Sequence, residues 1–347
     1  MLGERCADMS DLDRQRRQRL VIGLLLTTLV LAVAGLAAGS EGWSLVDLAQ
    51  IWSGPDGALI IGQIRAPRTL GAWLTGALLG LAGAVAQGLF RNPLADPYLL
   101  GSASGASLGV VLVLAATALS GHAISLATAD AIARFGLVSA AFAGALLGVL
   151  LTLTLARGAQ QTTRLLLAGV VVGVVLSAVS DLVTTAAPEA LRGRQAFLLG
   201  STGFLGWSSC AALALGLAFT LPPSWRLART LDALTLGADT AHSLGLALPR
   251  IRLLLVTALA LATGLAVSQA GLIAFVGLAA PHLVRRFAPA PHGFTLVASA
   301  ATGGTLLLTA DVLARTLIAP QEVPVGVLTA LLGGGYLLWL LHRRRAA

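Results

Sequence analysis

The sequence predicts an all-α polytopic membrane protein with about ten transmembrane helices and an inverted internal repeat. First, 56% of its 347 residues are hydrophobic and only 11% are charged, whereas an ordinary soluble domain is roughly 25% charged. Second, apolar runs recur along the whole chain, each close to the ~20 residues that a helix needs to cross the hydrocarbon core. Third, arginines stand at the ends of these runs. A soluble fold could not cover so much apolar surface, so we place the protein in a membrane.

The first apolar run, 20–38, follows the basic residues Arg14, Arg16, Arg17 and Arg19. Its apolar length exceeds the ~7–15 residues of a signal-peptide core. We therefore interpret it as the first transmembrane helix. A cleaved signal peptide is the alternative, because small residues follow the run.

Nine further apolar runs predict the remaining crossings. Their bounds are 69–90, 98–118, 136–156, 164–186, 204–222, 251–268, 271–286, 294–318 and 324–341. The eighth of the ten crossings is short and contains Pro281. The runs together predict one transmembrane domain, 20–341, between an N-terminal tail, 1–19, and a C-terminal tail, 342–347.

The arginines orient these helices, because cytoplasmic loops carry an excess of basic residues. All 23 basic residues are arginine, and 17 of them fall on the cytoplasmic side if the N-terminus is inside. We therefore expect a multi-pass protein of the bacterial inner membrane with both termini in the cytoplasm. Six arginines remain outside: Arg65, Arg68, Arg134, Arg192, Arg194 and Arg315.

An internal repeat relates the two halves of the chain. Pro67-Arg68 and the tetrapeptide 84–87 recur 182 residues later, as Pro249-Arg250 and the tetrapeptide 266–269. Five predicted crossings separate the copies, so they have opposite orientations in the membrane. Inverted repeats are common in transporters, since two interchangeable halves can give two access states. Chance matching in a sequence rich in alanine and leucine is the alternative.

The residues that are missing exclude several function classes. A Walker A loop needs a lysine to hold the phosphates of ATP, and the chain contains none. Cys6 and Cys210 lie far apart and no HExxH motif occurs, so we expect no cofactor or metal site. The central parts of the predicted helices hold no clear carboxylate, which argues against ion coupling. The arginines form no patch with interleaved aromatic residues, which argues against nucleic acid. These observations predict a transport component that is not an enzyme.

Two prolines interrupt the chain between the second and third crossings. Pro93 and Pro97 exclude a continuous helix there. Irregular backbone at membrane depth occurs only where it is buried in protein or lines a watery cavity. Asn92 and Asp96 suit a turn and a helix cap. From the residues alone, a tight turn and a role in a transport pathway are equally good interpretations.

Several motifs follow one another in a fixed order. They are Arg65-Ala66-Pro67-Arg68, Asn92–Pro97, Arg164–Gly169, Leu236-Gly237 to Leu244-Gly245, Gly271–Leu278 with Pro281–Arg285, and Glu322–Gly326. In order and spacing this series resembles the FecCD/BtuC-type permeases, the membrane subunits of ABC importers for iron–siderophores, haem and cobalamin. The resemblance covers residues 60–341. The last helix departs from it, with Gly333-Gly334-Gly335 where family members often have a proline.

The resemblance implies a type II ABC importer permease that forms a homodimer. Its partners would be ATPase subunits in the cytoplasm and a periplasmic or lipid-anchored solute-binding protein outside, with membrane lipid around it. ATP hydrolysis would belong to the separate ATPase. Iron–siderophore is the default substrate, with cobalamin and haem behind it, and no single residue distinguishes them.

The resemblance also implies that Arg65, Arg68 and Arg315 receive acidic residues of the binding protein. Three arginines on the outer face oppose the positive-inside bias, and arginine suits bidentate recognition of carboxylates. For Arg315 the alternative is an ion pair with Asp311, four residues earlier on the same helix, worth only about 0.2–0.5 kcal/mol.

Two sites on the cytoplasmic side follow from the same resemblance. A gate would be formed by Asn92, Leu94, Thr162 and Thr163, for which simple loop turns are the alternative. The segment 226–250 would dock into an ATPase through two helical pieces, with contacts at Leu236, Gly237, Asp239, Leu244 and Gly245. Asp239 and Thr240 would cap the second piece. A polar loop without a partner is the alternative for this segment.

Simple observations distinguish two alternative functions from that of an ABC importer permease. A stand-alone ion-coupled secondary transporter would take up solute by itself. An intramembrane enzyme would need clustered nucleophiles, bases or metal ligands at membrane depth, which the sequence does not show. Pro281-His282 is not such a site, because Arg285 and Arg286 beside it would repel a cation. Co-purification with an ATPase that carries a Walker A loop would favour the permease.

Overall fold

The computed structural model describes residues 2–39, 42–43, 57–119, 131–158 and 161–345, and this part of the chain is almost entirely helical. The strands in the described part are β1 (Ala38–Gly39) and β2 (Gly42–Trp43), which pair antiparallel directly after the first helix. The predicted all-α class is confirmed.

A helix coincides with each of the ten predicted crossings. These helices are α1 (Leu2–Ala37), α4 (Ala66–Phe90), α5 (Ser102–Leu119), α6 (Ala131–Leu155), α7 (Thr162–Ala186), α9 (Trp207–Arg226), α12 (Leu248–Ala270), α13 (Val276–Phe287), α14 (His292–Thr316) and α15 (Val325–Arg345). Within the described residues, seven of them are long and apolar enough to cross a bilayer; α9, α13 and α15 are not among the seven. The number of crossings is therefore only approximately ten.

Short helices join the long ones. They are α3 (Gly57–Leu59), the π-helix η1 (Ile60–Arg65), the 3₁₀-helix η2 (Pro97–Leu100), α8 (Glu189–Leu199), α10 (Ala228–Thr235) and α11 (Ala238–Ser243). The π-helix precedes Pro67, which lacks the N–H that an α-helical hydrogen bond would need. It leads directly into α4, so residues 57–90 form one continuous helical rod.

The eighth predicted crossing is indeed short. Its helix, α13, has 12 residues and begins only at Val276. Gly271 (φ 71°) ends the preceding helix α12, and Phe275 (φ 67°) caps α13 in the left-handed region. The chain between them is therefore not helical, and the helix after it is too short to span the hydrocarbon core alone.

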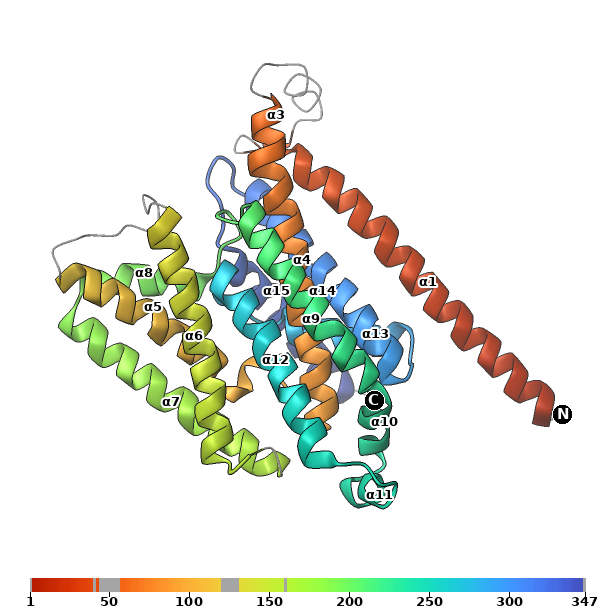
Figure 1. Ribbon diagram of the computed structural model, residues 1–347. Helices are drawn as coiled ribbons and strands as arrows, with labels where there is room; N and C mark the ends of the chain where they lie inside the picture. Colours follow the sequence, from red (N-terminus) through yellow and green to blue (C-terminus); the bar gives the residue numbers. More distant parts are fainter. Residues whose placement is uncertain (1, 40–41, 44–56, 120–130, 159–160, 346–347) are drawn as a thin grey trace.

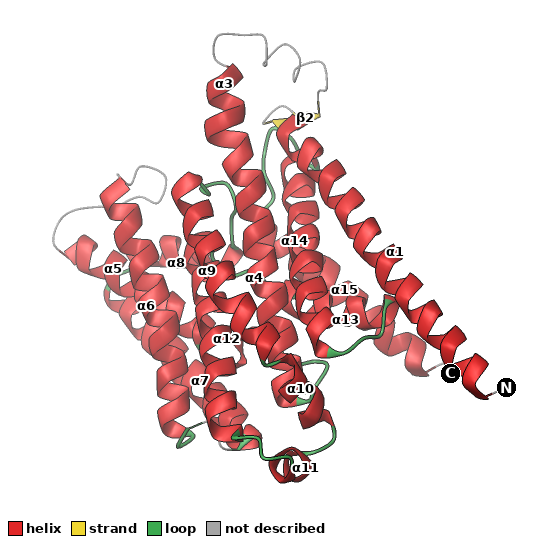
Figure 2. Cartoon of the chain, turned by 45° about the vertical axis from the view of Figure 1, so that its right-hand side comes forward, coloured by secondary structure: helices red, strands yellow, loops and turns green. Residues whose placement is uncertain are grey.

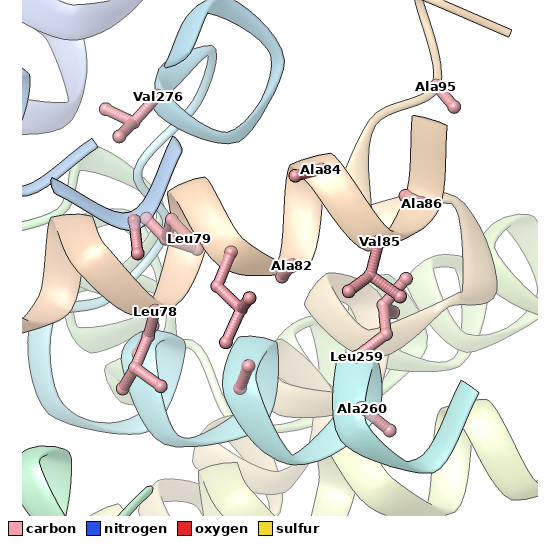
Figure 3. Packing of buried hydrophobic residues seen from close by; sticks show 14 of the residues in the cluster. Leu78, Leu79, Ala82, Ala84, Val85, Ala86, Ala95, Leu259, Ala260 and Val276 are labelled. Atoms are coloured by element: carbon pink, nitrogen blue, oxygen red, sulfur yellow. The ribbon is translucent and has the colours of Figure 1, made fainter. Parts of the chain in front are cut away.

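Helix α4 is the buried centre of the molecule, packed against α14, α12, α13 and α9 (Figure 1). Small residues permit this packing: a Cβ built on Gly80 would lie 2.1 Å from the carbonyl oxygen of Ser299 in α14. Figure 3 shows Val85 of α4 against Leu259 of α12, inside the largest cluster of buried apolar residues. Close backbone approach through glycine is typical of membrane helices.

The arrangement agrees with an inverted repeat. The helices α4 and α12, which carry the two copies of the repeated motif, run in opposite directions (Figure 1). The start of α1 and the end of α15 lie at the same end of the molecule as α10 and α11, and α3 lies at the opposite end (Figures 1 and 2). We call these the α11 end and the α3 end.

Candidate functional site

At the α3 end, Arg68 connects two acidic residues that are distant in sequence. Its Nε donates to Asp311 Oδ1 at 3.1 Å, and its Nη1 and Nη2 donate to Glu322 Oε1 and Oε2, both at 2.8 Å. The Asp311 side chain is 0% exposed and that of Glu322 is 42% exposed, while that of Arg68 is 12% exposed. The guanidinium therefore bridges a buried carboxylate and an exposed one, and its contact with Glu322 is bidentate.

The buried carboxylate of Asp311 has two further partners. Arg315, one turn later on α14, donates an Nη2 hydrogen bond to Oδ2, and the hydroxyl of Thr202 donates to Oδ1. A charge buried in apolar surroundings is tolerated only when it is paired and hydrogen-bonded, and Asp311 meets both conditions. The ion pair between Arg315 and Asp311, which was the alternative interpretation of Arg315 from the sequence, is therefore present in the structure.

Arg65 and Arg315 both hold the end of α1. Arg65 Nη1 donates to the carbonyl oxygens of Leu36 and Ala37 at 3.0 and 3.3 Å, and Arg315 Nη1 donates to that of Gly35 at 2.9 Å. The last carbonyls of a helix have no partner within it and carry partial negative charge, so cations stabilise them. The structure thus brings the three predicted docking arginines to one end of the molecule, and gives each of them partners within the chain.

The loop after α4 forms the turn that the two prolines predict. Helix α4 ends at Phe90, and Arg91 takes a left-handed conformation with φ 49°. The Asn92 side chain accepts a hydrogen bond from the Leu94 amide at 2.9 Å, and Asp96 accepts one from the Tyr98 amide at 2.8 Å as the cap of η2. Burial raises the pKa of Asp96 above its usual value, and the hydrogen bond from Tyr98 partly offsets the rise.

The predicted gate residues are small or exposed. Leu94 is 55% exposed at the tip of this loop. Thr162 and Thr163 lie in the first turn of α7 rather than before it, Thr162 half-buried and Thr163 exposed. The helix η2 packs on α7, where the carbonyl oxygen of Leu99 would be 2.1 Å from a Cβ on Gly169.

The segment between α9 and α12 forms two short helices, as predicted. Gly237 (φ 115°) separates α10 from α11, and Gly245 (φ 78°) follows α11. Glycine adopts these conformations without the steric cost that other residues have. Leu236 is 69% exposed and Leu244 is 64% exposed, directly before these glycines. The α11 end of the molecule thus carries two large apolar side chains that other residues of the described chain leave largely uncovered.

The predicted cap of α11 is wrong in detail. Gly237 occupies the cap position, and Asp239 lies within the first turn with Thr240 after it. The positive φ of the cap favours glycine over a residue with a side chain. Asp239 instead places its negative charge near the positive end of the short helix.

A polar contact that the sequence did not reveal joins α10 to α14. Asp232 Oδ1 accepts a hydrogen bond from the His292 amide at 2.9 Å and lies 2.7 Å from His292 Nδ1. His292 is the first residue of α14, so Asp232 acts as a cap supplied by another helix. Gly88 of α4 lies close to the His292 ring, with a built Cβ 2.9 Å from Nε2. The segment with the exposed leucines is thereby fixed to α14 and α4.

The acidic partners were less visible in the sequence than the arginines. Glu322 stood within a family motif, without an assigned contact. Asp311 stood out only through its spacing from Arg315. Asp232 carried no signal, since its partner His292 is 60 residues away.

Comparisons with known proteins agree on one family. A sequence model of the FecCD transport family matches residues 25–343. The hemin transport system permease protein HmuU of Yersinia pestis is 38% identical over 336 residues, covering 94% of this chain and 96% of that protein. The vitamin B12 import system permease protein BtuC of Klebsiella pneumoniae is 37% identical over 342 residues, covering 97% of each chain.

A solved structure shares the fold. It is described as an inward-facing conformation of a metal-chelate type ABC transporter, and it superposes with a TM-score of 0.80 at 28% sequence identity. The match covers 94% of this chain and 99% of that chain.

Proposed function

Because the chain belongs to the FecCD transport family and is a permease subunit of an ABC importer, we propose that its cargo is a metal chelate. The named relatives transport hemin and vitamin B12, and the structural relative is a transporter of metal-chelate type. These cargoes share a metal held inside a large organic ligand. A ferric siderophore has the same chemistry and belongs to the same proposal.

The two ends of the molecule carry different surface residues, and this difference supports the role of an importer subunit with a partner protein at each end. The arginine cluster lies at the α3 end, and the exposed leucines of the 236–245 segment lie at the α11 end (Figure 1). A binding-protein-dependent importer needs one partner surface on each side of the membrane. We place the solute-binding protein at the α3 end and the ATPase at the α11 end.

At the α3 end, the docking residues are Arg65, Arg68 and Arg315. Arg68 carries two amino groups in fork geometry, which hold the exposed carboxylate of Glu322 in a bidentate contact. Arg315 is 3% exposed and paired with Asp311. It therefore acts on docking indirectly, by holding the Asp311 carboxylate that also binds Arg68. Docking through a bidentate arginine contact would give the partner a fixed orientation.

At the α11 end, Leu236, Gly237, Asp239, Leu244 and Gly245 form the contact to a separate ATPase subunit, which supplies the ATP hydrolysis. Asn92, Leu94, Thr162 and Thr163 close the pathway on this side. The exposure of Leu94 and the fixed turn at Asn92 support a gate, because an apolar tip on a rigid loop can pack across a symmetry axis.

The protein is a multi-pass inner-membrane protein, and we place both termini in the cytoplasm, with the transmembrane domain at 20–341 between the tails 1–19 and 342–347. Two observations support this orientation: most arginines fall on the side that this orientation makes cytoplasmic, and both termini lie at the same end of the molecule. We further propose a homodimer in which α7 and α15 face their symmetry mates. Large apolar side chains of α7, including Leu167, Val170 and Val174, are exposed and support this contact.

Reconstitution tests the function. Proteoliposomes that contain this chain, the ATPase that co-purifies with it and ATP should take up radiolabelled hemin, cyanocobalamin or a ferric hydroxamate only when the solute-binding protein is present. Omission of ATP or of the ATPase should stop uptake. Uptake by this chain alone on a proton or sodium gradient would contradict the proposal and establish a secondary transporter instead. Affinities of the binding protein for the three chelates would identify the cargo.

A further inference from the structure

The edge of Arg68 that suits a partner's carboxylate is already occupied. Both amino groups of its guanidinium donate to Glu322, each at 2.8 Å. This is the fork geometry with which arginine recognises carboxylates in general. A second carboxylate cannot take the same two donors while Glu322 holds them.

The two acidic partners of Arg68 differ in how easily they can leave it. Asp311 is 0% exposed and is also held by Arg315 and Thr202. Glu322 is 42% exposed and lies between the end of α14 and the start of α15. Water screens an exposed ion pair and competes for its charges, so such a pair is weak. The exchangeable partner is therefore Glu322, while Asp311 keeps the guanidinium in place.

We propose that Glu322 is an internal stand-in for the docking carboxylate of the solute-binding protein. On docking, the partner's carboxylate replaces Glu322 on the Arg68 fork, and the guanidinium keeps its contact with Asp311. The exchange has two consequences. The permease alone never presents an unpaired arginine at this position, and docking frees the Glu322 side chain, in the loop before α15, from the Arg68 guanidinium. The inference rests on the proposed docking role of Arg68.

Affinity measurements on the complete complex test the exchange. The permease with its ATPase is placed in nanodiscs, and the Kd of the solute-binding protein that supports uptake in proteoliposomes is measured at fixed salt. Glu322→Gln removes the competing charge with little change in shape, and should lower the Kd roughly two- to fivefold, the range expected for an exposed ion pair. Arg68→Gln should raise the Kd, and adding Glu322→Gln to it should cause no further change.

A matched control and a second variant show whether a change in Kd is specific to the Glu322 carboxylate. Glu189→Gln removes another exposed carboxylate, in the first turn of α8, and should leave the Kd unchanged. Glu322→Asp keeps the charge but shortens the side chain, and should lower the Kd as well, because the shorter carboxylate reaches the fork less well.

The outcomes separate the two proposals. If Arg68→Gln weakens binding but neither Glu322 variant tightens it, the exchange is wrong and docking at Arg68 stands. If Arg68→Gln leaves the Kd unchanged, the docking proposal fails and the exchange fails with it. A lower Kd for Glu322→Gln that persists in the Arg68→Gln background would also overturn the exchange, because the effect would not pass through Arg68.

Discussion

Asp311 is the residue on which the arginine cluster depends. Its carboxylate is fully buried and serves Arg68, Arg315 and Thr202 at once. Without it, two guanidinium groups would face each other in a poorly solvated site. The negative charge of Asp311 therefore allows both arginines to lie where α4 and α14 meet at the α3 end.

We predict that Asp311→Asn destabilises the protein by about 3–5 kcal/mol, because it leaves buried arginine charge uncompensated. Glu322→Gln should cost at most ~1 kcal/mol, since that pair is exposed. Thermal unfolding of the purified protein in detergent measures both. A Tm of Asp311→Asn equal to that of the wild type would show that Asp311 does not hold the cluster together.

Charge reversal at the docking arginines has to be designed with this cluster in mind. The double variant Arg65→Glu, Arg68→Glu should abolish uptake, as expected for a docking site. Glutamate at position 68 would also face Asp311, so loss of uptake alone is ambiguous. The pair Arg65→Gln, Arg68→Gln avoids this repulsion and should still reduce uptake strongly while membrane insertion stays normal. Unchanged uptake in the neutralised pair would exclude docking at these two residues.

At the scale of elements, α10 packs on α14 and is also joined to it by a capping contact. Asp232 of α10 accepts a hydrogen bond from the first amide of α14 and contacts the His292 ring, and Gly88 of α4 lies close to that ring. A displacement of α10 by the ATPase would therefore be passed to α14, and through its close packing to α4. The same two helices carry Asp311 and Arg68 at the α3 end.

We predict that Asp232→Ala uncouples the transporter. The polar contact between α10 and α14 is lost, whereas the exposed Leu236 and Leu244 are unchanged. ATP hydrolysis should persist while the amount of chelate imported per ATP falls several-fold. Both rates are measured in the same proteoliposomes, with Glu189→Ala as the control for removal of an acidic side chain. A normal ratio of import to hydrolysis in Asp232→Ala would contradict a coupling role.

The packing of α4 on α14 depends on glycine. A Cβ at position 80 would lie 2.1 Å from the Ser299 carbonyl oxygen, so the two backbones would have to separate. We predict that Gly80→Ala costs about 1–3 kcal/mol, the range for overpacking a buried contact. Gly23→Ala on α1 is the matched control, because no atom lies within 4 Å of its built Cβ. Equal melting temperatures for the two variants would show that the α4–α14 contact tolerates a methyl group.

At the scale of the whole molecule, the helices divide into a buried set and an exposed set. Most of α4 is covered by other helices of the chain, whereas most of α7 is not. Lipid alone would accept the apolar face of α7, and so would a second copy of the chain. The proposed homodimer assigns this face to the second copy.

We predict that cysteines introduced along α7 form disulfide-linked dimers in membranes. The positions are those of the exposed residues Leu167, Val170, Val171, Val174 and Val175. At least one variant should cross-link upon mild oxidation, because two copies of α7 would face each other. Leu25→Cys on α1 is the control, exposed in the same way and expected to face lipid. A complete α7 scan without cross-linked dimers would contradict the proposed interface.

Local features of the sequence were sufficient for the elements. The apolar runs predicted the ten helices at the expected crossings to within a few residues at most ends, since the length of a membrane helix is set by the bilayer. Pro93 and Pro97 predicted the break after α4, because proline cannot continue a helix. Gly237 and Gly245 marked the two breaks around α11, because positive φ favours glycine. In each case the physical cause lies within a few residues of the effect.

Sequence patterns alone were therefore enough to predict the membrane class, the helices, their breaks and the arginines of the α3 end. The groups that these arginines contact are seen only in the folded chain. Arg68 and Glu322 are 254 residues apart, and Asp232 and His292 are 60 apart. Such pairs exist because α4, α10, α14 and the loop before α15 meet in space. Helix formation follows from local chain chemistry, whereas the partner of a buried charge follows from the packing of helices that are far apart in the chain.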